Sequence, residues 1–174
     1  ILCCCSPAYA HDDTELLEGE PASTPDAPGI VEMRKMLGLS QSAFWGRLSV
    51  TQSGGSRYET GRNIPFPVNA LLHLIYDPED EAHAFLVRLR EPCRRLGKVD
   101  HDAVNAVSDG PEARALRAAF GLSQSAFWNL FGITQSSGSR YEAGEEMPAG
   151  AVTLIRLVFL SEEAAIQLLS KLRT

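Results

Sequence analysis

The sequence predicts an all-α protein that consists of two tandem copies of one small helical unit, preceded by an acidic tail. No segment of the 174 residues shows the two-residue alternation of a strand, whereas apolar residues recur at helical spacing. Residues 38–61 and 121–144 are identical at 17 of 24 positions, with an offset of 83 residues. The expected organisation is a tail (1–27), copy one (28–91), a linker (92–110) and copy two (111–174).

The tail accounts for the acidic balance of the chain. Residues 1–27 contain six acidic residues and no Lys or Arg, and the formal net charge of the whole sequence is −6. Segments rich in Pro, Ser and acidic residues bury too little apolar surface to fold, so we expect a disordered tail. Residues 28–100 carry a net charge of +2 and residues 101–174 a net charge of −2. The acidic average therefore does not exclude a nucleic-acid partner.

The first helix of each copy is expected to end at a glycine, Gly38 or Gly121, a common residue after helix ends. In copy two this helix starts around residues 108–111, where a proline suits the first helical turn. In copy one it runs to Leu37. The residues expected on its buried face are Ile30, Met33, Met36 and Leu37.

Serine and threonine caps mark the next two helices. Ser40 and Ser123 precede the second helix, and Thr51 and Thr134 precede the third, after a turn of three or four residues. The third helix is expected to end before Gly61 in copy one and Gly144 in copy two. Pro67 and Pro148 open the fourth helix. The fifth begins with acidic residues, which the helix dipole favours.

A capped helix, a tight turn and a second short helix with polar residues at its start form a helix-turn-helix signature. Both copies read SQSAFW, then TQS, then GSRYE. With an upstream Arg and a downstream Pro, this motif resembles the lambda-repressor-like (Xre) family over roughly residues 30–91 and 111–173. The resemblance implies two lambda-repressor-like helix-turn-helix bundles of about five short helices each. It further implies that the third helix of each copy binds double-stranded DNA in the major groove.

The resemblance also implies roles for the polar residues. The glutamine that opens the second helix is expected on a phosphate, and the start and outer face of the third helix on bases. Gln, Ser and Arg suit base contacts, and their recurrence in both copies favours this role over a merely solvated face. The base-reading candidates are Gln52, Ser53, Ser56, Arg57, Gln135, Ser136, Ser139 and Arg140. The phosphate candidates are Gln41 and Gln124 with Arg47 and Arg62, which flank the motif of copy one.

Two structural features are expected beside this surface. The resemblance places the first helix against the end of the third, which predicts the ion pairs Arg34–Glu59 and Arg117–Glu142. In the second helix, Trp45 and Trp128 stand where the family has a small residue. Gly55 and Gly138 stand where the family has a buried branched residue. We expect the indole to fill the vacated space; the alternative is an exposed indole and a loosened third helix.

The two copies are not expected to contribute equally. Arg47 and Arg62 of copy one are replaced by Leu130 and Glu145 in copy two. Phosphate contacts dominate affinity for DNA, so copy one is expected to bind more strongly. Copy two is then a weaker half-site reader or a pairing module.

The sequence therefore predicts a sequence-specific transcriptional regulator of double-stranded DNA, acting as a single chain or as a homodimer. The alternative is an antitoxin-like or other protein-interaction module with the same fold. No P-loop, GxSxG, paired-carboxylate or metal-ligand pattern is present in the sequence. We therefore expect that the protein is not an enzyme and that it binds no metal, cofactor or small-molecule ligand. No apolar run approaches 18 residues, so we expect no membrane segment and a cytoplasmic protein.

Overall fold

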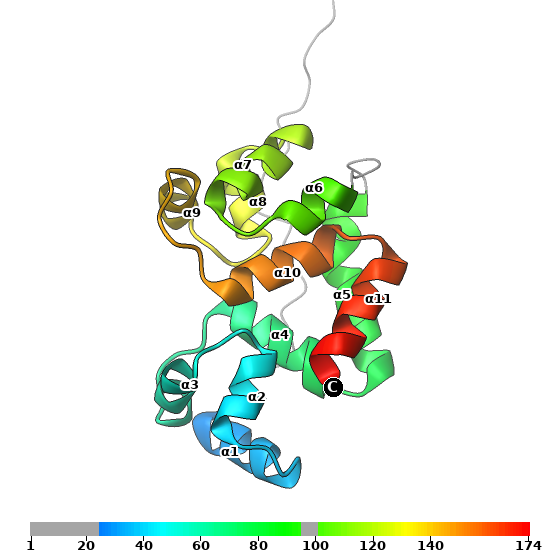
Figure 1. Cartoon of the computed structure of the whole chain (residues 1–174). Helices are drawn as coiled ribbons and strands as arrows, with labels where there is room; N and C mark the ends of the chain where they lie inside the picture. The colour runs from blue at the N-terminus through cyan, green and yellow to red at the C-terminus, as the bar shows by residue number, and fades with distance from the viewer. Residues whose placement is uncertain (1–24, 95–100) are drawn as a thin grey trace, which may run out of the picture.

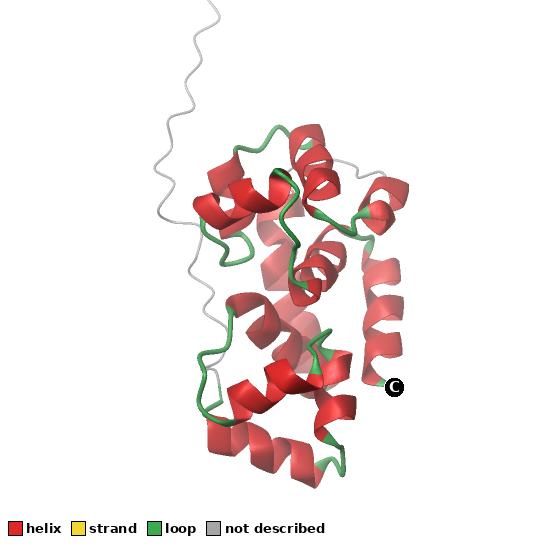
Figure 2. Cartoon of the chain, turned by 60° about the vertical axis from the view of Figure 1, so that its left-hand side comes forward, coloured by secondary structure: helices red, strands yellow, loops and turns green. Residues whose placement is uncertain are grey.

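The computed structural model describes residues 25–94 and 101–174, and every regular element in these ranges is an α-helix (Figures 1 and 2). The all-α prediction is therefore confirmed. Copy one contains α1 (Ala27–Met36), α2 (Gln41–Arg47), α3 (Gln52–Glu59), α4 (Phe66–Tyr76) and α5 (Glu79–Arg94). Copy two contains α7 (Gly110–Ala119), α8 (Gln124–Asn129), α9 (Gln135–Glu142), α10 (Ala149–Phe159) and α11 (Glu162–Arg173), with α6 (His101–Ala106) before it. None of the helices in the described ranges has the length and apolar character needed to span a bilayer.

The helix ends follow the predicted capping residues. The side chains of Ser40 and Ser123 accept hydrogen bonds from backbone N–H groups of α2 and α8, each at 3.1 Å. Thr51 and Thr134 do the same for α3 and α9 at 3.2 and 3.3 Å. The glycines after α1 and α7 both adopt a φ of 65°, a conformation that side-chain-bearing residues rarely adopt.

The predicted buried face of α1 is partly wrong. Ile30 is fully buried and Met33 is packed against the core, but Met36 is 78% exposed and Leu37 is 49% exposed. In copy two, the residue at the position of Leu37 is Phe120, which stacks on Phe159 with ring centroids 4.9 Å apart.

The corresponding aromatic residue of copy one makes the same contact that Phe159 makes with Phe127, whose rings stack at 5.8 Å. Tyr76, at the position of Phe159, stacks on Phe44 at 4.4 Å, and its hydroxyl donates to the carbonyl oxygen of Phe44. Leu37 is aliphatic, so the ring stack of Phe120 on Phe159 has no counterpart there, and Leu37 is 49% exposed.

The predicted tail and linker boundaries also differ from the helix bounds. Asp26 accepts a hydrogen bond from the N–H of Gly29 at 2.9 Å and caps α1, so that helix begins inside the predicted tail. The rest of the tail, residues 1–24, lies outside the described residues. The range 92–110 contains the end of α5, all of α6 and the start of α7. Val104 and Val107 are fully buried there, and Arg156 Nε donates to the carbonyl oxygen of Val107 at 2.7 Å, which ties this segment to α10.

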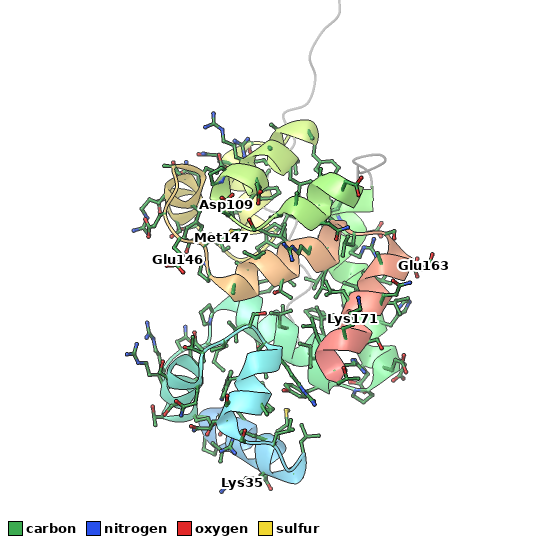
Figure 3. All side chains as sticks on the ribbon, in the orientation of Figure 1. Lys35, Asp109, Glu146, Met147, Glu163 and Lys171 are labelled. Carbon is green, nitrogen blue, oxygen red and sulfur yellow. The ribbon has the colours of Figure 1, made fainter. Side chains whose placement is uncertain are left out.

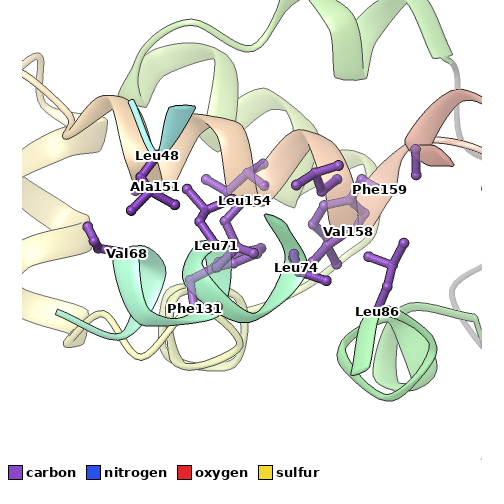
Figure 4. Packing of buried hydrophobic residues seen from close by; sticks show 14 of the residues in the cluster. Leu48, Val68, Leu71, Leu74, Leu86, Phe131, Ala151, Leu154, Val158 and Phe159 are labelled. Atoms are coloured by element: carbon purple, nitrogen blue, oxygen red, sulfur yellow. The ribbon is translucent and has the colours of Figure 1, made fainter. Parts of the chain in front are cut away.

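A single hydrophobic core runs through both copies. Its buried side chains meet where α4 crosses α10, in the middle of the molecule (Figures 1 and 4). Ser49 and Thr153, one from each copy, join their hydroxyl groups beside this crossing at 3.0 Å. The residues that Figure 4 labels in this part of the core are Leu48, Val68, Leu71, Leu74, Leu86, Phe131, Ala151, Leu154, Val158 and Phe159. The copies are thus joined by shared burial as well as by the chain.

The contacts between the copies are reciprocal. Helix α5 packs on α10, and its counterpart α11 packs on α4. Arg90 of α5 donates to the carbonyl oxygen of Leu160 at the end of α10. The equivalent residue, Arg173, donates to the carbonyl oxygens of Leu74 and Asp77 at the end of α4, at 2.9 and 3.2 Å. An interface in which equivalent residues exchange contacts is the property of two-fold symmetry, so an approximate two-fold axis relates the copies.

Candidate nucleic-acid interface

The outer faces of α3 and α9 form the candidate interface. The two helices lie on the same side of the molecule, at the left in Figure 1, with α4 and α10 between them. Each follows a turn that contains a residue in the left-handed region, Ser49 with φ 57° or Gly132 with φ 60°. The turn lets α2 and α8 bury their phenylalanines while the next helix stays at the surface.

The predicted base-reading residues lie along these outer faces. Gln52, Ser53 and Arg57 are exposed, and Ser56 is half-buried. Their counterparts have the same exposure, namely Gln135, Ser136, Arg140 and Ser139. Figure 3 shows side chains of both helices projecting from the left-hand side of the molecule. The structure therefore brings two similar polar stripes to one side.

The inner face of each helix rests on a tryptophan. Trp45 and Trp128 are fully buried. A Cβ atom at Gly55 would lie 2.1 Å from Cδ1 and Cγ of Trp45, and one at Gly138 would lie 2.1 Å from Cδ1 of Trp128. The predicted exchange of size between indole and glycine is confirmed, and an exposed indole is ruled out. Because glycine has no side chain, α3 packs closely on α2, and α9 packs closely on α8.

A carboxylate accepts four hydrogen bonds at the end of each of these helices. Glu142 accepts from Arg117 Nε at 2.8 Å and Nη2 at 2.9 Å, so the predicted ion pair is present and has two hydrogen bonds. It also accepts from Trp128 Nε1 and Gln124 Nε2, each at 2.9 Å. Glu59 of copy one has the same four donors, on Arg34, Trp45 and Gln41. The sequence predicted the arginine partner but not the other two.

The opening glutamines of α2 and α8 connect this carboxylate to the exposed stripe. Gln41 Nε2 donates to Glu59, while its Oε1 accepts from Gln52 Nε2, both at 2.8 Å. Gln124 and Gln135 repeat the second bond at 2.8 Å. Gln41 and Gln124, predicted as phosphate contacts, therefore also position the first base-reading candidate of each copy. The only sign of this positioning role in the sequence was that both glutamines of the pair occur at the same positions in each copy.

The carboxylates are held ionised. Burial alone raises the pKa of Glu142, but the hydrogen bonds from Arg117, Gln124 and Trp128 outweigh it and hold the pKa at about 2. The pKa of Glu59 is lowered against the same opposing effect of burial, by bonds from Arg34, Gln41 and Trp45.

We expect acid to destabilise the fold through these two groups. Because the folded pKa of Glu142 lies below that of the unfolded chain, its contribution is present above about pH 4.5 and is lost as the pH falls towards 2. The loss from Glu142 is expected to be about 3 kcal/mol, at about 1.4 kcal/mol for each pH unit. Denaturant unfolding between pH 2 and 7 measures it. The Glu142→Gln variant should show a flatter pH dependence, and an unchanged slope would contradict this origin.

The arginines of the two stripes differ in their surroundings. Arg140 lies 3.6 Å from Glu145 in an exposed ion pair, and its Nη2 donates to Ser137 at 3.4 Å. Among the residues that the structure describes, Arg57 has no ion-pair partner, because Arg62 and Gly54 stand at the positions of Glu145 and Ser137. Of the two arginines predicted to read bases, Arg57 thus has no ion-pair partner among the described residues, while Arg140 has Glu145.

The other predicted phosphate contacts belong to copy one. Arg62 is exposed directly after α3. Arg47 is half-buried and donates through Nη2 to the carbonyl oxygen of Thr174 at 2.9 Å. Copy two places Glu145 and Glu146 after α9, and Figure 3 labels Glu146 there. The positive charge near the stripes is therefore concentrated around α3.

One of three comparisons with known proteins finds a match. A family model described as an RsaL-like HTH domain matches residues 31–75 and again residues 114–158. These two segments run from α1 into α4 and from α7 into α10, and together they cover about half of the chain. No curated protein and no solved structure shows significant similarity to the chain. The matched segments contain both stripes and both carboxylates, whereas α5 and α11 lie outside them.

Proposed function

Because the chain belongs to the RsaL-like helix-turn-helix family, we propose that it is a transcriptional regulator that reads specific sequences in double-stranded DNA. The observation that supports this most is the pair of matched polar stripes on one side of the molecule, each ending in an arginine. The lambda-repressor-like docking geometry suits these stripes, with α3 and α9 entering the major groove. Half-sites are then expected about 34 Å apart, one turn of the duplex.

Each residue type in the stripes has a chemical role in this proposal. Arg57 and Arg140 offer a guanidinium fork to guanine, and Gln52 and Gln135 offer an amide to adenine. The serines accept or donate to several bases. Gln41 retains a second N–H on its amide nitrogen for a phosphate, since only one is used by Glu59. Arg62 adds a phosphate contact beside α3, whereas Arg47 must first leave the carbonyl oxygen of Thr174 to make one.

Selection of bound duplexes from a random pool, with the full chain as bait, tests the proposal. We expect enrichment of a defined motif and an affinity that falls steeply with salt concentration. If no duplex is enriched at low salt, the DNA-binding proposal fails. A protein partner for the exposed acidic residues Glu145 and Glu146 then becomes the better candidate.

We expect Arg57→Ala to weaken binding of the selected duplex more than Arg140→Ala does. Loss of a bidentate guanine contact costs about 1–3 kcal/mol, or roughly 5- to 150-fold in affinity. Arg140 must first leave Glu145, so its contact is expected to contribute less. Titration of labelled duplex by fluorescence anisotropy measures both variants.

Two further variants complete that comparison. Arg114→Ala removes an exposed arginine of α7 outside the stripes and should leave affinity nearly unchanged. Glu145→Ala frees Arg140 and should strengthen binding. A larger loss for Arg140→Ala than for Arg57→Ala would reverse the order proposed for the two copies.

A further inference from the structure

The turn before each third helix contacts the other copy, and the residues there are unlike in the two copies. We infer that each copy is shaped to pair with the other and not with a second copy of itself. A single chain then presents two DNA-binding copies related by a two-fold axis. It is expected to bind two half-sites that form an inverted repeat in the DNA, although the two copies follow one another in the same direction along the protein chain. The DNA part of this inference rests on the proposed function; the pairing part does not.

The first unlike contact involves Gly132 and Phe66. A Cβ atom at Gly132 would lie 2.6 Å from Cβ and 2.8 Å from Cγ of Phe66, so the glycine of copy two is what admits the phenylalanine of copy one. Across the approximate two-fold axis, the equivalent positions hold Ser49 and Ala149. At this equivalent contact, the turn residue Ser49 has a side chain, and Ala149 stands in place of the phenyl ring of Phe66.

The second unlike contact involves Ser49 and Thr153. Their hydroxyl groups are 3.0 Å apart, between the turn of copy one and α10 of copy two. The equivalent positions hold Gly132 and Ala70, neither of which has a side-chain hydroxyl. Ser49 also adopts a left-handed φ of 57°, which is costly for a residue with a Cβ atom. Its hydrogen bond to Thr153 compensates for part of that cost.

If copy one paired with copy one of a second chain, or copy two with copy two, both of these matched contacts would be lost. Two copies of the first kind would each bring Ser49 against Phe66, where the spacing at Gly132 leaves no room for a Cβ atom. Two copies of the second kind would each set Gly132 opposite Ala149, without the half-buried phenyl ring that packs there in the unlike pair. Overpacking and cavities both destabilise an interface, so the unlike pair is favoured over either like pair.

The two-fold relation also fixes the order of bases that the chain reads. Readers related by a two-fold axis meet the two strands of a duplex equivalently, which requires half-sites in inverted orientation. The base-reading residues are identical in the two copies, as Gln, Ser, Ser and Arg. We therefore expect the same core sequence in both half-sites, bound by one chain for each duplex.

The pairing is tested on the full chain by thermal unfolding. Gly132→Ser gives copy two the turn residue of copy one and should lower Tm by about 4 °C or more, because its Cβ atom meets Phe66. Phe66→Ala alone should also lower Tm. In the double variant the part of the Gly132→Ser loss that comes from the clash should disappear, and only the cost of a Cβ atom at a φ of 60° should remain. The mirror variant Ser49→Gly is the control, and it should lower Tm less than Gly132→Ser does.

Additive losses in the double variant would overturn the inferred fit between Gly132 and Phe66. Sedimentation at micromolar concentration gives the second readout. We expect a monomer without DNA, because each copy already has its partner. A stable dimer of chains would overturn the inference, since it would require a pairing surface left open by the other copy.

DNA binding is tested with the half-site sequence that selection recovers. Three duplexes contain this half-site as an inverted repeat, as a direct repeat or as a single copy. We expect one chain on the inverted repeat, with at least tenfold higher affinity than for the other two. Equal affinity for the direct repeat, or two chains on the inverted repeat, would overturn the inverted reading while DNA binding itself stands. If none of the duplexes is bound, the proposed function fails, and the unfolding result still decides the pairing.

Discussion

Replacement of Glu142 by alanine is expected to lower the free energy of unfolding by about 3–5 kcal/mol, which is a large part of the stability of a typical domain. The carboxylate is 3% exposed and accepts four hydrogen bonds, two of them from Arg117. Its removal leaves a largely buried guanidinium without a counter-charge, together with the unpaired N–H groups of Trp128 and Gln124. Denaturant unfolding at pH 7 measures the loss.

Glu145→Ala is the matched control for this variant. Glu145 also forms an ion pair with an arginine, Arg140, but both side chains are at least half exposed. Exposed pairs contribute about 0–1 kcal/mol, so the control should stay close to the parent protein. Similar losses for the two variants would mean that burial and the number of donors do not decide the contribution of these carboxylates.

Gly55→Ala is expected to destabilise the protein by about 3 kcal/mol, although alanine is the better helix former. The new methyl group would lie 2.1 Å from the ring of Trp45. The indole has little freedom to move, because it packs against Phe44 and Tyr58 and donates its N–H to Glu59 at 2.9 Å. Any shift that admits the methyl group weakens that bond, and the free energy of unfolding reports the cost.

Gly46→Ala provides the opposite expectation within the same motif. Gly46 is an exposed residue of α2, and a Cβ atom there would meet nothing within 4 Å. The change should therefore stabilise the protein by about 0.5–1 kcal/mol, through helix propensity alone. If Gly55→Ala stabilised the protein as Gly46→Ala does, close packing of the indole on α3 would be excluded.

Features that depend on residues near one another in sequence could be predicted. Ser40 and Thr51 cap helices because a side-chain oxygen three residues before a free N–H group has only local requirements. The Trp45–Gly55 exchange was also predictable, because both copies depart from the family pattern at the same two positions. Both ion pairs were predicted from the family resemblance, which places the first helix of each copy against the end of the third.

Features that depend on contacts between residues of different helices could not be predicted in this way. The sequence shows that Leu37 and Phe120 are equivalent and apolar, but not that Leu37 is 49% exposed while Phe120 is half-buried against Phe159. The burial of Val104 and Val107 depends on α10, which comes much later in the chain. The bond between Gln41 and Gln52 was missed because each glutamine had a reasonable role of its own.

The core shared by α4 and α10 has a consequence for how a promoter would respond to this protein. A regulator that must first dimerise occupies its site in proportion to the square of its concentration when it is scarce, which gives a threshold. Under the proposed function, the second DNA-binding copy is already present at the high effective concentration that a covalent connection provides. Occupancy then rises linearly from the first molecules made, and the dose response is graded.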